Sequence, residues 1–97
     1  MIVVKNKHMK VIKIGAVWCA GCIVMKPIWR DIESENPWLE TTAYDIDDDA
    51  EIVQAYGDLR KLPIFIFFGK NGNEVARFHG EISRNDFLKK IDPLKNL

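Results

Sequence analysis

The stretch that decides the fold is residues 10–22, which read KVIKIGAVWCAGC. Residues 10–17 are rich in β-branched and small apolar side chains, which is typical of a strand largely buried in a sheet. Cys19 and Cys22 follow where apolar side chains begin to recur at helical spacing. The sequence therefore predicts a buried strand that leads into a helix whose opening carries both thiols.

This helix is expected to run to about residue 35 and to bury one apolar face. Pro27 lies inside it, removes one backbone hydrogen bond and is expected to kink it. Asn36 and Pro37 are expected to end it. The residues predicted to face the core are Met25, Ile28, Trp29 and Ile32.

Downstream of this helix, strand and helix patterns alternate again. Residues 41–46 are predicted to form a second strand, and residues 64–68, IFIFF, a central strand covered on both faces. Between these strands we expect a short helix, capped by Asp48 or Asp49 and closed by Gly57. The residues of this helix predicted to face inward are Ile52, Val53 and Tyr56.

The last third of the chain is predicted to add a hairpin and a final helix. Residues 69–73, GKNGN, favour a turn, so residues 74–78 are expected to pair with the central strand. Ser83 is expected to cap a helix that Pro93 stops. The residues expected to dock this helix are Phe87, Leu88, Ile91 and Leu94. This element order predicts an α/β fold with a mixed sheet and helices on both faces.

Composition limits the classes of partner and the compartment. The chain of 97 residues suits one domain, 1–97, and 47% hydrophobic residues favour a conventional core. Lys plus Arg (14) balances Asp plus Glu (14), so neither nucleic acid nor an anionic membrane has electrostatic support as a partner. No apolar run reaches the length of a signal-peptide core or a membrane span, and we expect a cytoplasmic protein.

The cysteine pair indicates reactivity rather than cross-linking. A secreted disulfide scaffold of this size would usually carry four or more cysteines, and this chain has two. The free N–H groups and the positive dipole end of a helix favour the thiolate of Cys19, which is the form that attacks disulfides. Cys22, one turn further along, is placed to displace a captured substrate. The expected chemistry is dithiol–disulfide exchange.

A zinc site is the alternative use of such a pair. Structural zinc nearly always takes four protein ligands, and only His8 and His79 remain to complete a set with the cysteines. Neither histidine has the spacing of a ligand. Redox exchange is therefore the favoured hypothesis, and no metal or other cofactor is expected.

Several features together resemble the thioredoxin family. Residues 18–22, WCAGC, resemble the Trp-Cys-Gly-Pro-Cys signature, and Pro27 follows the second cysteine by five residues, as the family's helix-kinking proline does. Residues 62–64, Leu-Pro-Ile, resemble the family's cis-proline segment, and Gly80 resembles the glycine of its substrate groove. The resemblance covers about residues 10–91. It implies a thioredoxin-like fold with a central mixed sheet of four, possibly five, strands.

The resemblance also implies roles for individual residues. Cys19 would be the exposed nucleophile and Cys22 the buried resolving thiol. Leu62 would offer backbone hydrogen bonds to a substrate strand, and Pro63 would be cis and pack against the cysteines. The other residues expected to line the substrate groove are Trp18, Ala20, Gly21 and Gly80.

Two departures from the family pattern lie at the site itself. Ala20 and Gly21 replace Gly-Pro between the cysteines, which predicts a reduction potential different from that of a typical thioredoxin. Lys13 stands six residues before Cys19, where the family has an acid thought to accept the proton of the resolving thiol. Two interpretations of Lys13 remain: its cation stabilises a nearby thiolate, or its side chain extends to solvent.

A third departure lies at the start of the chain. Only 18 residues precede Cys19, too few for the family's first strand together with its first helix. Residues 1–5 are still expected to supply an edge strand. The missing helix would leave one face of the sheet thinly covered, so the protein is expected to be a monomer or, through that face, a homodimer or the partner of another protein.

The predicted function is that of a thioredoxin-type thiol–disulfide oxidoreductase that reduces protein disulfides. Its electrons would come from a thioredoxin reductase or a comparable dithiol donor. One alternative is a glutaredoxin-like, glutathione-dependent enzyme, although the residues after Gly80 lack the Gly-Gly and acidic pair of that family. The other alternative is a redox-responsive protein-binding module with little turnover.

Overall fold

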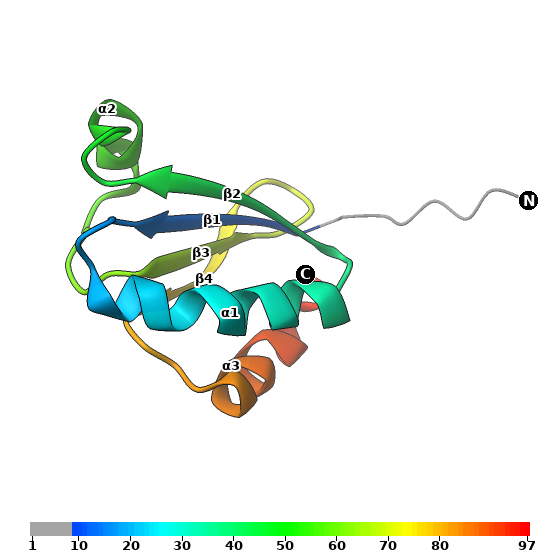
Figure 1. The fold of residues 1–97 in the computed structure, drawn as a ribbon. Coiled ribbons are helices and arrows are strands. Elements are labelled where there is room, and N and C mark those ends of the chain that lie inside the picture. The colour runs from blue at the N-terminus through cyan, green and yellow to red at the C-terminus, as the bar shows by residue number, and fades with distance from the viewer. Residues whose placement is uncertain (1–8) are drawn as a thin grey trace, which may run out of the picture.

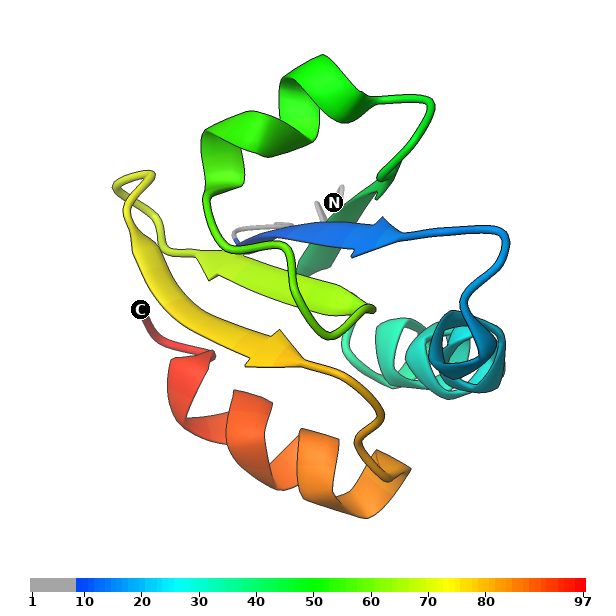
Figure 2. The ribbon, with the colours of Figure 1, turned by 90° about the vertical axis from the view of Figure 1, so that its left-hand side faces the viewer.

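The computed structural model describes residues 9–97 and has three layers (Figures 1 and 2). The sheet is the middle layer. Helices α1 (Ala20–Glu35) and α3 (Arg84–Ile91) pack on one face of it. Helix α2 (Ala50–Val53) and the 3-10 turn η1 (Gln54–Tyr56) lie on the other face. The expectation of helices on both faces is therefore confirmed.

The sheet of the described residues has four strands in the order β2–β1–β3–β4. Strand β1 (Met9–Gly15) pairs in parallel with β2 (Leu39–Asp45) and antiparallel with β3 (Ile64–Phe68). Strand β4 (Glu74–His79) pairs antiparallel with β3 and closes the hairpin. The mixed sheet and the interior place of β3 are as predicted, whereas the edge strand expected for residues 1–5 lies outside the described residues.

Trp29 is the centre of the core beneath α1 and α3. Its side chain is 2% exposed, and its ring centroid lies 5.0 Å from that of Phe65 and 5.3 Å from that of Phe87. Its Nε1 donates a hydrogen bond to Thr41 Oγ1 at 3.1 Å. These contacts connect α1 to the strands that carry Phe65 and Thr41 and to helix α3, which carries Phe87. The other buried residues of this cluster are Met9, Val11, Met25, Ile32, Trp38, Leu39, Phe67, Ile91 and Leu94.

The opposite face of the sheet is better covered than the sequence predicted. Ile14, Ile64 and Ile66 are completely buried there. Tyr56 of η1 and Leu59 of the following loop pack against this second cluster, together with Val53. The expectation of a thinly covered face is therefore wrong over β1 and β3, because the loop after η1 lies across the strands.

The predicted short helix is present as α2, a single α-helical turn, which continues directly into η1. Asp49 is its N-cap but makes no side-chain cap, because its carboxylate accepts a hydrogen bond from Asp45 N at 2.8 Å. Val53 is buried as expected, but Ile52 is 46% exposed and the prediction that it faces inward is wrong. Adjacent residues on a helix point about 100° apart, so a single turn buries only one of the two. Gly57, with φ of 83°, ends the element as predicted.

The C-terminal helix α3 is held as the sequence predicted. Ser83 Oγ accepts a hydrogen bond from Asp86 N at 3.2 Å, which satisfies one of the free N–H groups at the helix start. Phe87 is completely buried, and Arg84 pairs with Glu35 of α1. Within residues 9–97, no helix combines the length and apolar character needed to cross a bilayer.

Candidate active site

The dithiol lies where β1 gives way to α1. A turn closed by the hydrogen bond from Cys19 N to Ala16 O, at 3.2 Å, reverses the chain after β1. Cys19 is the N-cap of α1, and its Sγ accepts a hydrogen bond from Cys22 N at 3.1 Å. A backbone N–H directed at sulfur stabilises the thiolate more than the thiol. The predicted arrangement of both thiols at the helix opening is therefore confirmed, and both cysteines are free.

The exposure of the two thiols is the reverse of the expectation. Cys19 is only 8% exposed, whereas Cys22 is half-buried. Cys22 borders a cavity of about 310 Å³ between α1 and the β1–β2 edge. The cavity exists because Gly15 and Ala43, which line it, present almost no side chain. The expectation that Cys19 is exposed and Cys22 is buried is therefore wrong.

The environment of Cys22 keeps its proton in place in the reduced protein. Burial raises the pKa of the Cys22 thiol to about 11, and its hydrogen bond with Cys19 and the charge of Cys19 act in the same direction. A backbone hydrogen bond from Ala16 and the charge of Lys13 oppose this rise. Among the described residues, no three His, Cys, Asp or Glu side chains are grouped to hold a metal ion.

Lys13 lies beside the resolving thiol. It projects from β1 into the cavity that Cys22 borders, and it is half-buried there. Burial lowers the pKa of its ammonium, while the neighbouring Cys22 and Glu33 raise it and Lys26 lowers it. The structure therefore places the Lys13 side chain in the same cavity as Cys22, where its charge acts on the thiol, while leaving it partly exposed to solvent.

A second cavity, of about 530 Å³, opens on the other side of the dithiol at Cys19. Trp18 stands at its edge, 66% exposed, and its Nε1 donates a hydrogen bond to Asp47 Oδ2 at 2.7 Å. Sequence reasoning missed Asp47, because an acidic run before a helix indicates capping. The residues that line this groove are Trp18, Cys19, Ala20, Ile46, Leu59, Arg60, Lys61 and Leu62.

The segment that resembles the cis-proline loop completes the groove. The Leu62–Pro63 peptide bond is cis, as expected, and Pro63 is buried. Pro63 O accepts a hydrogen bond from Gly80 N at 2.8 Å, and Gly80 has a φ of 80°, which favours glycine. A Cβ on Gly21 would lie 3.4 Å from Leu62 O and 3.3 Å from Glu81 Cγ. The structure thus brings these predicted residues together and adds Glu81, which no sequence motif marked.

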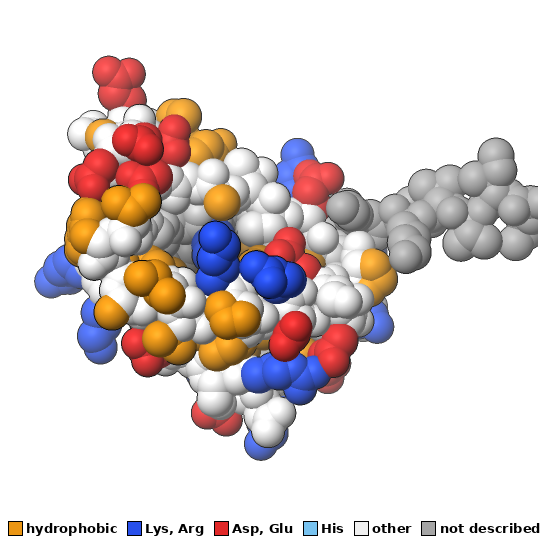
Figure 3. Space-filling model, in the orientation of Figure 1, with side chains coloured by type: hydrophobic (Ala, Val, Ile, Leu, Met, Phe, Trp, Pro, Cys, Tyr) orange, Lys and Arg blue, Asp and Glu red, His pale blue; other side chains and the backbone are white. Residues whose placement is uncertain are grey.

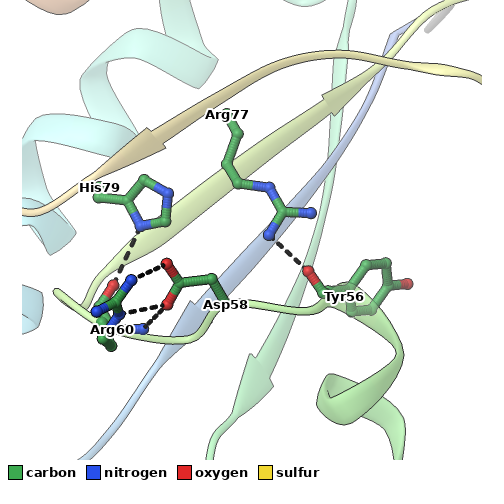
Figure 4. Close-up of polar contacts among 5 residues, drawn as sticks. All are labelled: Tyr56, Asp58, Arg60, Arg77 and His79. Carbon is green, nitrogen blue, oxygen red and sulfur yellow. Dashed lines mark hydrogen bonds and ion pairs between the residues drawn. The ribbon is translucent and has the colours of Figure 1, made fainter.

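A polar network fixes the loop that delivers Leu62 to the groove (Figure 4). Arg60 donates two hydrogen bonds from its guanidinium to Asp58, both at 3.0 Å, and holds the pKa of that carboxyl well below its usual range. His79 Nδ1 lies 3.1 Å from Arg60 O, and Arg77 Nη1 donates to Tyr56 O at 2.5 Å. Two side chains of strand β4 therefore hold the backbone of the loop that leads to Leu62.

Gly15 is expected to be a sensitive position because of its contact with the resolving thiol. A Cβ added there would lie 3.2 Å from Cys22 Sγ, so Gly15→Ala requires the Cys22 side chain to move slightly within a packed site. We expect a loss of about 1 kcal/mol in the free energy of unfolding, measured in urea. Gly21→Ala is the control: its Cβ would meet the flexible Glu81 side chain, which can move aside, and alanine favours the helix by about 0.5–1 kcal/mol. Equal stability of the two variants would contradict the prediction.

Comparison with known proteins agrees with this geometry. A family model described as thioredoxin matches residues 1–86. Thioredoxin H5 of rice is 31% identical over 84 residues, which cover 87% of this chain and 60% of that protein. A thioredoxin of Chlamydia pneumoniae is 32% identical over 76 residues, which cover 78% of this chain and 72% of that protein. This chain thus spans less than two thirds of the rice relative's length.

Solved structures give the same result for the fold. The thioredoxin of Fasciola hepatica superposes with a TM-score of 0.79 and 26% identity, covering 92% of this chain and 83% of that one. The thioredoxin of Trypanosoma brucei brucei also has a TM-score of 0.79, at 23% identity, and covers 93% and 77%. The fold, the site geometry and the sequence matches agree, and the chain belongs to the thioredoxin family.

Proposed function

We propose that the protein is a thiol–disulfide oxidoreductase that reduces disulfides in other proteins. The observation that carries this proposal is the position of Cys19: its sulfur is the helix N-cap, accepts the N–H of Cys22 and borders an open groove. A cysteine sulfur that accepts a backbone N–H at a helix start, with a second thiol beside it, is the arrangement that disulfide exchange requires.

The reaction would proceed in two exchanges. The Cys19 thiolate attacks one sulfur of the substrate disulfide, and the other substrate sulfur leaves as a thiolate that takes up a proton. Cys22 then loses its proton and attacks Cys19 Sγ, which releases the second substrate thiolate. The substrate disulfide gains two electrons, and the protein is left with a Cys19–Cys22 disulfide.

The groove suits an extended polypeptide as substrate. Trp18 and Val17 are exposed apolar side chains beside Cys19, and such surfaces favour protein partners. Leu62 would hydrogen-bond the substrate backbone in the manner of strand addition. The dithiol would be regenerated by a thioredoxin reductase or a comparable dithiol donor, in the cytoplasm, where thiols are kept reduced.

The two alternative functions have less support. The relatives reported above are thioredoxins, and a glutaredoxin-like, glutathione-dependent enzyme is not favoured. A binding module with little turnover would need no second thiol one helical turn from the first, placed to resolve a mixed disulfide.

The proposal is tested by insulin reduction with dithiothreitol as the electron source. We expect catalytic amounts of the reduced protein to accelerate precipitation of the insulin B chain over dithiothreitol alone. Acceleration only when glutathione is supplied would favour the glutaredoxin-like alternative. No acceleration, from a folded protein with two titratable thiols, would favour the binding module.

A further inference from the structure

We propose that Lys13 is a positioning residue for the second exchange: its ammonium group, in the cavity behind the dithiol, stabilises the Cys22 thiolate as it attacks the mixed disulfide. The inference rests on the proposed function and concerns a position where this chain departs from the family pattern. It assigns to a cation the place that the family gives to a proton-accepting acid.

The backbone of β1 aims Lys13 at this place. Side chains alternate along a strand, and Met9 and Val11 on the same face as Lys13 are completely buried against α1. Lys13 is paired with Ala43 of β2, whose small side chain leaves room for the cavity. The Lys13 side chain therefore leaves β1 on the face that α1 covers and lines the cavity that Cys22 borders.

Two lysines, Lys13 and Lys26, line the cavity. Figure 3 shows basic side chains between α1 and β2, with acidic side chains beside them. The acidic groups that face Lys13 are Glu33 on α1 and Asp45 at the end of β2. Of these charged groups, Lys13 is the one whose charge acts on Cys22 and lowers its pKa.

The balance of effects on Cys22 changes during the reaction. In the reduced protein, the hydrogen bond with Cys19 and the charge of Cys19 both raise the pKa of Cys22. Once Cys19 is in a mixed disulfide, its sulfur carries no negative charge, so the charge effect disappears and the hydrogen bond that it accepts from the Cys22 thiol weakens. The rise in the Cys22 pKa caused by burial is then opposed by the hydrogen bond from Ala16 and by the Lys13 cation, which both lower this pKa. The Lys13 charge thus has its largest relative effect at the step that needs a Cys22 thiolate.

A cation and an acid act differently at this position. A carboxylate would accept the Cys22 proton but repel the thiolate that forms. An ammonium leaves the proton to water and attracts the thiolate. The rate of the second exchange is therefore expected to rise with pH until Cys22 is ionised. With a charged Lys13, this rise is expected at a lower pH than in a variant without the Lys13 charge.

The test separates the two exchanges by stopped-flow absorbance with a neutral probe, 4,4′-dithiodipyridine. Attack by Cys19 releases one thiopyridone in a phase that depends on probe concentration. Attack by Cys22 releases the second in a phase that does not. Lys13→Met removes the charge at similar length, Lys13→Arg keeps it, and Lys26→Met removes the other lysine of the same cavity as a matched control.

We expect Lys13→Met to slow the second phase about tenfold at neutral pH, which corresponds to a shift of about one pH unit in its profile. The first phase of Lys13→Met stays unchanged. In Lys13→Arg and Lys26→Met, the rate of the second phase stays within about twofold of wild type, well below the tenfold effect of one pKa unit. Equal second phases in wild type and Lys13→Met would overturn the inference, as would an equal slowing in Lys26→Met. The absence of either phase in the wild type would instead contradict the proposed function.

Discussion

Cys19→Ser is expected to abolish the reduction of protein disulfides, leaving only the rate of dithiothreitol alone. A serine hydroxyl does not ionise at neutral pH, so the group that accepts the hydrogen bond from Cys22 N would no longer be a nucleophile. The remaining Cys22 thiol still holds its proton, because burial, the largest cause of its raised pKa, is unchanged in the variant. Insulin reduction measures this loss, and thermal unfolding shows whether the variant keeps its fold.

Cys22→Ser is the matched control, because it removes the second exchange and preserves the first. Cys19 still attacks, but the mixed disulfide must then be released by an external thiol. Intramolecular attack gains an effective concentration far above millimolar, so release is expected to slow by at least about a thousandfold. Intact-mass spectrometry after mixing with a disulfide-linked peptide would show the accumulated adduct. An adduct on Cys19→Ser instead would reverse the assigned roles.

Trp29→Ala is expected to have the largest effect on stability. The side chain is 2% exposed and packs against three phenylalanine rings, so its loss leaves a cavity beneath α1. Removal of a buried tryptophan costs about 3–5 kcal/mol, against a total stability of about 5–15 kcal/mol for a small domain. Urea unfolding followed by circular dichroism measures the change.

Two further variants separate packing from the hydrogen bond of Trp29. Trp29→Phe keeps most of the ring contacts but leaves Thr41 Oγ1 without the Nε1 donor, and is expected to cost about 1–2 kcal/mol. Trp18→Ala removes an indole that is 66% exposed, and is expected to change stability by no more than about 0.5 kcal/mol. Similar losses in Trp18→Ala and Trp29→Ala would contradict the core that we describe.

Much of the fold could be predicted because its signals are local. The apolar run 64–68 identifies the interior strand, and the turn residues 69–73 identify the hairpin. The cysteine pair at the start of an apolar helix pattern locates the dithiol. The cis bond at Pro63 followed from the family resemblance rather than from any local pattern, since a Leu-Pro pair alone also suits an ordinary turn.

The parts that sequence reasoning missed depend on contacts between distant segments. The accessibility of Cys22 depends on the small residues Gly15 and Ala43, which line the cavity beside it. Asp47 reaches Trp18, and Glu81 lies beside Gly21, from loops whose paths are set by packing. No spacing or periodicity carries that information.

The two thiols open onto different cavities, one on each side of the helix start. A small fluorophore attached to Cys22 in the Cys19→Ser variant would therefore sit behind the helix, away from the face that meets a substrate. Such a label would report on docking without obstructing it. The geometry that serves the chemistry thus also provides a place for an optical sensor of partner binding.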